Sequence, residues 1–272
     1  MVTILALSLM AIDSVSNSDI SKPWGLVDPP PLIGKELLVD EAALAPLDTE
    51  KPKGFFEWQS SNVQLLQGHN YKLGESDRSI LSLEHAHGWA YGNNFAFLDI
   101  TKPEGEQQRY YGEFAPRLSL GRLTDTSLAW GPVKDLYLVG NLEWGTGIDP
   151  RYLGGAGVEL DVPGFRFLRL EAMLRDDSDK DGQTWQLTTV WNLPFKIAAQ
   201  SFVFEGFLDW AGPEGGGSHN LVAAPRLLYD LGENWGCPGT CHIGVEYQLW
   251  YNKYGIEGVN EHVPQLMLKY SF

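Results

Sequence analysis

The sequence predicts an all-β protein, a transmembrane antiparallel β-barrel of about twelve strands. Three observations lead to this fold class. Apolar and polar residues alternate with a period of two along most of the chain, as in strands with one apolar face. The aromatic content of 12% and the 30 Gly residues suit the aromatic girdles and tight turns of a membrane barrel. No run of about 18 apolar residues occurs after residue 20, which excludes a membrane-spanning helix from the rest of the chain.

The amino-terminal part differs from the rest. Residues 1–20 contain the apolar stretch VTILALSLMAI, which has the length of an export-signal core but lacks a preceding Lys or Arg and a small-x-small cleavage site. We expect a degenerate export signal there. Residues 21–54 are rich in Pro and acids, and since Pro blocks both helix and sheet hydrogen bonds, we expect a linker or tail. The barrel is expected to occupy residues 55–272.

From residue 55 onward, alternating segments of roughly ten residues are separated by turn residues. The twelve predicted strands are 56–69, 78–87, 90–100, 109–121, 133–144, 151–161, 165–175, 183–193, 197–210, 219–231, 241–253 and 261–272. An even number is what bacterial barrels require.

The connections between these segments supply a second signal. The second, sixth and eighth are short, reading HGWAYG, DVPGF and NLPFK, whereas the odd-numbered ones are expected to be longer and more polar. The fourth connection, from Arg122 to Lys134, is long and is expected to hold a helical turn or a plug-like segment. Short periplasmic turns and long external loops are typical of an outer-membrane barrel.

Charge narrows the function classes. The formal net charge is −15, with 35 acids against 20 bases and no basic run, so the chain lacks the basic patch that nucleic-acid binding needs. A β-sandwich lectin shares the aromatic content, and a lipocalin-like soluble barrel shares the alternation. The position of the charges distinguishes these classes from a membrane barrel.

Several strands carry charges on the phase opposite their aliphatic residues. EFAPRLSL places Glu113 and Arg117 opposite Phe114, and FRFLRLEAMLR places Arg169 and Arg175 on one such phase. An Arg that faces lipid at the bilayer midplane costs about 2–4 kcal/mol, so these faces are expected to line a hydrated lumen. A charge network that only fills and stabilises the barrel is an equally open reading of each of these residues.

Cysteine and metal signals are weak. Cys237 and Cys241 form a C-x-x-x-C pair with too few ligands for structural zinc, and they fit either a small disulfide loop or two free thiols. The acidic loop from Asp177 to Asp181 matches the first half of a calcium-binding loop, but Thr188 stands where the bidentate Glu belongs. A solvated acidic loop is the expected outcome, and no cofactor or metal is expected.

An enzyme is not expected. A hydrolase built on a barrel needs a nucleophile beside His, and none of the six His residues has a Ser partner that spacing identifies.

Four stretches resemble a known family. FFEWQSSNVQLLQG, FAPRLSLGRLTDTSLAWGPVKDLYL, GFLDWAG and GVEYQLWYNKYG are similar to segments of the nucleoside-specific outer-membrane channel family of the Tsx/OmpK type, and the resemblance runs from about Phe55 to Phe272. It implies a monomeric twelve-stranded barrel in the bacterial outer membrane whose narrow, aromatic-containing lumen passes nucleosides. Lipid and lipopolysaccharide would surround it. Members also serve as phage receptors, and Phe272 resembles the carboxy-terminal strand signal that the barrel-assembly machinery reads. The unusual amino end and the loop lengths depart from the better-known members, which leaves export and substrate preference open.

A nucleoside combines a flat base with a polyhydroxyl sugar, so it needs ring faces and polar hydrogen-bonding groups. The candidate ring faces are Phe55, Phe56, Phe95, Phe97, Phe207 and Trp250. The candidate polar partners are Glu84, Arg117, Glu143, Arg169, Glu171, Arg175, Asp209 and Glu246. For each aromatic residue the alternative is a position in the lipid-facing girdle. For the whole chain, the alternative is a barrel that acts mainly as a surface receptor, adhesin or structural protein.

Overall fold

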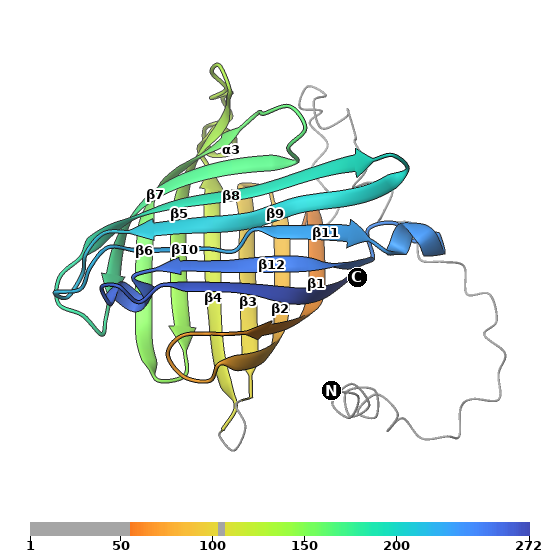
Figure 1. The fold of residues 1–272 in the computed structure, drawn as a ribbon. Coiled ribbons are helices and arrows are strands. Elements are labelled where there is room, and N and C mark those ends of the chain that lie inside the picture. The colour runs from red at the N-terminus through yellow and green to blue at the C-terminus, as the bar shows by residue number, and fades with distance from the viewer. Residues whose placement is uncertain (1–54, 103–106) are drawn as a thin grey trace, which may run out of the picture. The chain divides into compact units, whose positions relative to one another are not determined.

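The computed structural model describes residues 55–102 and 107–272, which form one closed antiparallel β-barrel (Figure 1). Its elements are β1 (Trp58–His69), β2 (Asp77–Trp89), β3 (Gly92–Thr101), β4 (Arg109–Ser119), α3 (Leu120–Thr124), β5 (Val133–Gly145), β6 (Ile148–Leu160), β7 (Phe167–Asp177), β8 (Thr184–Ile197), β9 (Gln200–Ala211), β10 (Asn220–Ala223), β11 (Arg226–Asp230), η2 (Gly232–Trp235), β12 (Cys241–Tyr251), η3 (Lys253–Gly255) and β13 (Glu261–Ser271). The predicted segments 1–20 and 21–54 lie outside the described residues, and their boundaries remain predictions.

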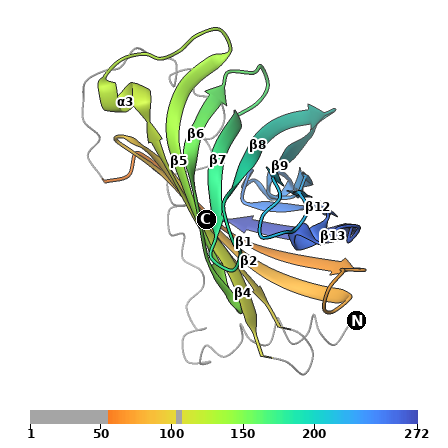
Figure 2. The ribbon, with the colours of Figure 1, turned by 90° about the vertical axis from the view of Figure 1, so that its left-hand side faces the viewer.

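The barrel closes between its first and last strands. Apart from β10 and β11, each strand pairs with the next along the chain, and β1 also pairs with β13 in a register that places Asn62 opposite Ser271. The strands wrap into a single curved wall. In Figure 1, β8 to β13 cross in front of β1 to β4, and Figure 2 shows the same wall from the side. Closure removes the two free edges, so every strand finds a backbone partner on both sides.

The tenth barrel position is divided into two strand segments. Both β10 and β11 pair with β9 on one side and β12 on the other, with Ala224 and Pro225 between them. Pro225 lacks an N–H and cannot donate to the ladder, although its carbonyl accepts from Tyr247 N at 2.9 Å. The described residues thus hold thirteen strand segments at twelve barrel positions, which confirms the predicted fold class.

Connection lengths differ from the prediction at two places. The β5–β6 connection was expected to be long, but β6 begins at Ile148 and the turn is only Thr146 and Gly147, whose φ of 74° suits Gly. The sequence NLPFK was expected to be a turn, yet it lies within β8, and the chain reverses at Ala198 and Ala199. Pro194 misled the prediction because Pro is tolerated in a strand wherever its missing N–H is not needed.

The fourth connection contains the expected helical turn. Helix α3 begins after Ser119, whose Oγ accepts a hydrogen bond from Arg122 N at 3.0 Å, and ends at Asp125 in the left-handed conformation. This connection, residues 120–132, is longer than each connection at the opposite end of the barrel. The length of a connection therefore does not indicate at which end of this barrel it lies.

The two faces of the wall differ as the alternation predicts. Large aliphatic side chains such as Leu65, Leu138 and Leu174 are exposed on the outer surface, where lipid would cover them. Polar and charged side chains on the opposite phase are buried inside the barrel, including Gln64, Glu143 and Gln265. Two small apolar clusters also lie inside, Leu66 with Leu228 and Met267, and Val139 with Leu153 and Met173.

Gly155 on β6 lies directly against the backbone of β7. A Cβ added to Gly155 would stand 2.0 Å from the backbone oxygen of Ala172, whereas a Cβ on Gly154 would meet nothing within 4 Å. These neighbouring glycines face opposite sides of the wall, since successive side chains alternate in a strand. The inner position therefore requires Gly and the outer one does not.

We predict that Gly155→Ala destabilises the barrel by at least about 1–3 kcal/mol, the usual cost of forced overpacking. Gly154→Ala, its matched control, should change the free energy of unfolding by less than about 0.5 kcal/mol because the added methyl group enters open space. Urea unfolding of both variants in lipid vesicles measures the difference. Equal stability of the two variants would contradict the assigned strand phase.

Candidate functional site in the barrel lumen

The lumen is lined by ionisable side chains from almost every strand. The inward acids are Glu84, Asp99, Glu113, Asp135, Glu143, Glu159, Glu171, Asp177, Glu205, Asp209, Asp230, Glu246 and Glu261. The inward bases on the strands include Arg78, Arg117, Arg151, Arg169, Arg175, Arg226 and Lys269. Acids outnumber bases, so the lumen of the described barrel is acidic.

The first group of charges, here the Arg175 cluster, joins β5, β6 and β7 to the loop after β9. Arg175 lies 2.7 Å from Glu143 and 3.5 Å from Glu214, and Arg151 lies 2.9 Å from Asp177 and 3.3 Å from Glu143. Asp177 has no exposed surface and also contacts Lys180 at 3.4 Å. The carboxylate of Asp177, the first in the acidic loop from Asp177 to Asp181, is therefore already held by bases. Among the described residues, no group of three metal-ligating side chains occurs.

The second group, here the Arg226 cluster, joins strands that are distant in the sequence. The Arg226 guanidinium lies 2.6 Å from Glu246, 2.9 Å from Glu84 and 3.8 Å from Glu205. Lys269 adds a 2.7 Å contact to Glu205. One arginine thus holds carboxylates from β2, β9 and β12 together across the lumen.

Two further pairs complete the buried network. Arg117 Nε lies 2.5 Å from Glu171, and the two residues are 6% and 7% exposed. Arg169 lies 3.1 Å from Glu159 and stacks over the Phe167 ring at 4.5 Å. Each of the three predicted lumen arginines therefore holds an acid.

Five inward acids have no basic partner in an ion pair among the described residues: Asp99, Glu113, Asp135, Asp209 and Asp230. Of these, Asp135 and Asp230 accept hydrogen bonds from backbone N–H groups of nearby turns. Glu113 accepts hydrogen bonds from Tyr111 at 2.6 Å and Asn141 at 2.7 Å. Asp209 accepts from Thr188 at 2.5 Å and lies within electrostatic range of Glu113. These carboxylates keep acceptor capacity that the ion-paired acids have spent.

Aromatic rings follow one side of the lumen beside Glu113. The ring centroids of Phe95 and Phe97 are 6.0 Å apart, and Tyr111 lies 5.8 Å from Phe97. Phe207 lies on the inward phase of β9, in register with Val190. Twelve of the fourteen predicted site residues therefore lie inside the barrel. They are Glu84, Phe95, Phe97, Arg117, Glu143, Arg169, Glu171, Arg175, Phe207, Asp209, Glu246 and Trp250.

Phe55 and Phe56 lie apart from the other candidates. Both precede β1; Phe55 is 79% exposed, and the Phe56 ring stacks 4.2 Å from the ring of His87 on the outer wall. The alternation rule could not place them because they stand before the first strand.

The loop after β12 folds into one mouth of the barrel. Lys253 lies 2.7 Å from both carboxylate oxygens of Glu261, and its ammonium lies 4.7 Å from the Trp250 ring centroid. Burial lowers the pKa of Lys253, although Glu261 opposes that shift. The ring of Trp250, which was predicted to stack on a solute, thus contacts the ammonium group of Lys253. Tyr71, from the loop after β1, donates to Gln265 on the same side.

Sequence reasoning missed several lumen residues. Arg151 and Lys269 share the polar phase of their strands and could have been found by the alternation used for Arg117. Arg226 begins β11, directly after the interruption at Ala224 and Pro225, and the interruption hid its phase. Lys253 and Glu214 lie in loops, and no periodic signal predicts that a loop residue enters the lumen.

In this structure Cys237 and Cys241 are free thiols, and a disulfide between them stays a prediction. Hydrogen bonds already close the turn between them. Thr240 donates to the Cys237 carbonyl from its backbone N–H at 3.4 Å and its hydroxyl at 2.7 Å, and Gly239 N donates to Asp230 at 2.7 Å. The turn therefore does not need a covalent bond to hold its shape.

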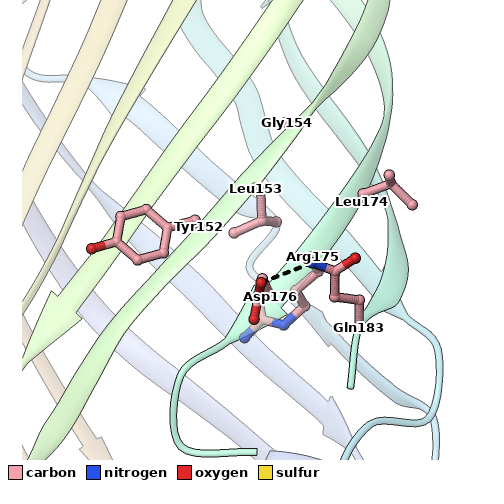
Figure 3. A pocket seen from close by; sticks show the side chains of 7 residues that line it. All are labelled: Tyr152, Leu153, Gly154, Leu174, Arg175, Asp176 and Gln183. Carbon is pink, nitrogen blue, oxygen red and sulfur yellow. Dashed lines mark hydrogen bonds between the residues drawn. The ribbon is translucent and has the colours of Figure 1, made fainter. Parts of the chain in front are cut away.

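A depression of about 420 Å³ lies on the wall of the barrel rather than along its lumen axis (Figure 3). Tyr152, Leu174 and Asp176 belong to its outward phase, and Gln183 donates to Asp176 at 2.8 Å. The missing side chain of Gly154 creates part of this space. We assign it no solute.

The Arg117–Glu171 pair provides a test of the buried network. We predict that Arg117→Met or Glu171→Met alone lowers the free energy of unfolding by about 3 kcal/mol, since each leaves a buried charge unpaired. The double variant should lose much less free energy of unfolding than the two single variants lose together. Arg122→Met, which breaks the exposed pair with Glu57, is the control and should cost less than about 1 kcal/mol. Strictly additive losses from urea unfolding in vesicles would show that the pair is not coupled.

No helix among the described residues is long and apolar enough to cross a membrane.

Comparisons with known proteins agree on one family. The family model described as "Nucleoside-specific channel-forming protein, Tsx" matches residues 53–214. Outer membrane protein OmpK of Vibrio parahaemolyticus is 32% identical over 117 residues, which cover 41% of this chain and 44% of that protein. An OmpK from Vibrio parahaemolyticus serotype O3:K6 is 25% identical over 180 residues, covering 60% of this chain and 67% of that protein. The first of these alignments thus spans less than half of the relative.

Among solved structures, the KdgM porin is similar with a TM-score of 0.48 and 12% identity, covering 78% of this chain and 99% of that one. Its complex with disordered oligogalacturonate has a TM-score of 0.47 at the same identity and coverage. With the family model matching more than half of its length, this chain belongs to the family of nucleoside-specific channel-forming proteins of the Tsx type and is a β-barrel of the bacterial outer membrane.

Proposed function

We propose that this barrel is a channel for the facilitated diffusion of nucleosides or of similar small solutes that combine an aromatic ring with hydroxyl groups. The observation that carries the proposal is the juxtaposition of the Phe95, Phe97 and Tyr111 rings with Glu113, an inward carboxylate that no base neutralises. Family membership supports the same solute class.

The rings suit the base of a nucleoside. Stacking of a base on an aromatic side chain contributes about 1–3 kcal/mol, which is enough to hold a solute briefly and weak enough to release it. Phe97 lies between Phe95 on one side and Tyr111 on the other, so a base can move from one ring to the next. A series of weak stations of this kind permits conduction.

The carboxylates suit the sugar and exclude phosphate. Glu113 and Asp209 are hydrogen-bond acceptors, and ribose hydroxyls are donors. The excess of acids in the lumen repels a phosphate group, so a nucleotide should enter far less readily than the matching nucleoside. The arginines act mainly by holding acids in place, as Arg117 holds Glu171.

The test is conductance in planar bilayers with nucleosides titrated as blockers. We predict that adenosine and uridine reduce the current, that adenosine monophosphate does so much less, and that Phe97→Ala weakens nucleoside block at least about fivefold. This factor corresponds to the lower end of the stacking range. Phe114→Ala is the matched control, because Phe114 lies on the same hairpin with its ring on the outer wall.

Two results would contradict the proposal. A folded barrel that conducts no current would exclude a channel. Equal loss of block in the Phe97→Ala and Phe114→Ala variants would show that the ring series does not contact the solute, even if the barrel conducts.

Removing a lumen arginine gives a second prediction. Arg169→Ala should move the ionic selectivity further toward cations, because Glu159 then loses its 3.1 Å partner. Folding is expected to survive, since the outer apolar band is unchanged. Reversal potentials under a salt gradient measure the shift. Unchanged selectivity in folded protein would mean that Arg169 does not contribute to the field along the conduction path.

A further inference from the structure

Two histidines lie side by side on the outer wall, where the alternation would otherwise place apolar residues. His85 and His87 occupy the outward phase of β2, since Glu84 between Leu83 and His85 turns into the lumen toward Arg226. Both are partly buried, and their ring centroids are 5.2 Å apart. Neither histidine belongs to the lumen described above.

A continuous hydrogen-bonded chain contains these two rings. Ser61 Oγ lies 2.8 Å from His85 Nδ1, His85 Nε2 lies 3.1 Å from His87 Nδ1, and Asn94 Nδ2 lies 2.8 Å from His87 Nε2. The chain runs across β1, β2 and β3, which are neighbours in the barrel wall (Figure 1). Each imidazole therefore has one nitrogen held by a polar side chain of an adjacent strand and one nitrogen that faces the other ring.

This arrangement supplies two imidazole ligands, each with a supporting partner. A metal-bound histidine commonly donates its second N–H to an oxygen-bearing partner, which fixes the tautomer and the ring orientation. Ser61 can accept from His85 Nδ1–H, and Asn94 can accept from His87 Nε2–H once its amide turns over and presents its oxygen. The two remaining nitrogens then both carry lone pairs, and the rings stay neutral throughout.

The distance between those two nitrogens is also suitable. With metal–nitrogen bonds of about 2.0–2.1 Å, two ligands of one tetrahedral ion stand roughly 3.3 Å apart. His85 Nε2 and His87 Nδ1 are 3.1 Å apart. A small rotation of each ring turns both lone pairs toward a shared point, and water completes the coordination. The Phe56 ring, 4.2 Å from the His87 ring, covers one side of the pair.

The pair also lies at an accessible end of the barrel. His87 precedes the two-residue turn after β2, at the end where β1 begins and β13 finishes. An even number of barrel positions places those two strand ends on the same side, which is the periplasmic side of a barrel inserted from the periplasm.

We propose that His85 and His87 form a two-imidazole site for a divalent transition-metal ion of the zinc and copper class, with Ser61 and Asn94 as supporting partners. Imidazole is a preferred ligand of these ions, and copper(II) binds such sites most tightly. The site is separate from the lumen and does not depend on the proposed solute.

The experiment is titration of the folded full-length chain in detergent with copper(II), followed by calorimetry and electron paramagnetic resonance. Cys237→Ser/Cys241→Ser is the background, because free thiols at the same end would react with copper. We expect one bound ion whose spectrum shows coupling to two imidazole nitrogens. His85→Asn and His87→Asn should each weaken binding at least about tenfold, and Ser61→Ala about tenfold, the lower end of the usual effect of a supporting partner.

The control is His262→Asn, which removes a histidine on the outward phase near the opposite end and should leave binding unchanged. Nucleoside block in bilayers should be the same in every variant, which separates this proposal from the proposed channel function. Unchanged copper affinity in both His85→Asn and His87→Asn would overturn the site. If those variants fail to fold, a spectrum of the background protein without two coupled nitrogens, or full affinity in Ser61→Ala, would overturn it equally.

Discussion

The structure depends on the pairing of charges inside a closed wall. Lipid on the outer face leaves the inner phase as the place for charged strand residues away from the strand ends, and a buried charge is tolerated only when it is paired or hydrated. Arg226 shows the consequence. Its guanidinium on β11 holds Glu84 on β2 at 2.9 Å and Glu246 on β12 at 2.6 Å, so it joins residues that are 142 positions apart in the chain. Such bonds fix the distance between opposite sides of the wall.

Most of the fold follows from the period of two in the sequence. Arg facing lipid is costly and Leu facing lipid is favourable, so the phase of Arg117 relative to Leu118 defines inside and outside before any contact is known. The same local rule cannot locate every turn. Pro194 reads as a turn residue but lies within β8, and Gly145 to Gly147 form a hairpin turn shorter than their loop-like surroundings suggest. Turn position depends on which N–H groups the neighbouring strand needs, and that information is not local.

Only part of the candidate site could be predicted from the sequence, because ion pairing in the lumen also depends on contacts that are not local. Alternation identifies Glu113 and Glu143 as inward residues. It does not show that Arg175 and Arg151 form ion pairs with Glu143 and leave Glu113 without one. That division depends on which strands face each other across the lumen. Phe56 illustrates the other limit, since an aromatic residue outside the strands has no phase, and its ring lies against His87 on the outer wall.

The lumen acids fall into two groups: those that form ion pairs with arginines and those that accept hydrogen bonds from neutral donors only. Acids that hold arginines are fixed by short charged contacts and cannot exchange those partners for a passing solute without leaving a charge unpaired. Glu113 has only the neutral donors Tyr111 and Asn141, and a neutral donor can be replaced by a solute hydroxyl at little cost. It stands beside the ring series of Phe95 and Phe97. The part of the wall that contributes least to the ion-pair network is therefore the part best suited to exchange contacts with a neutral, ring-bearing solute.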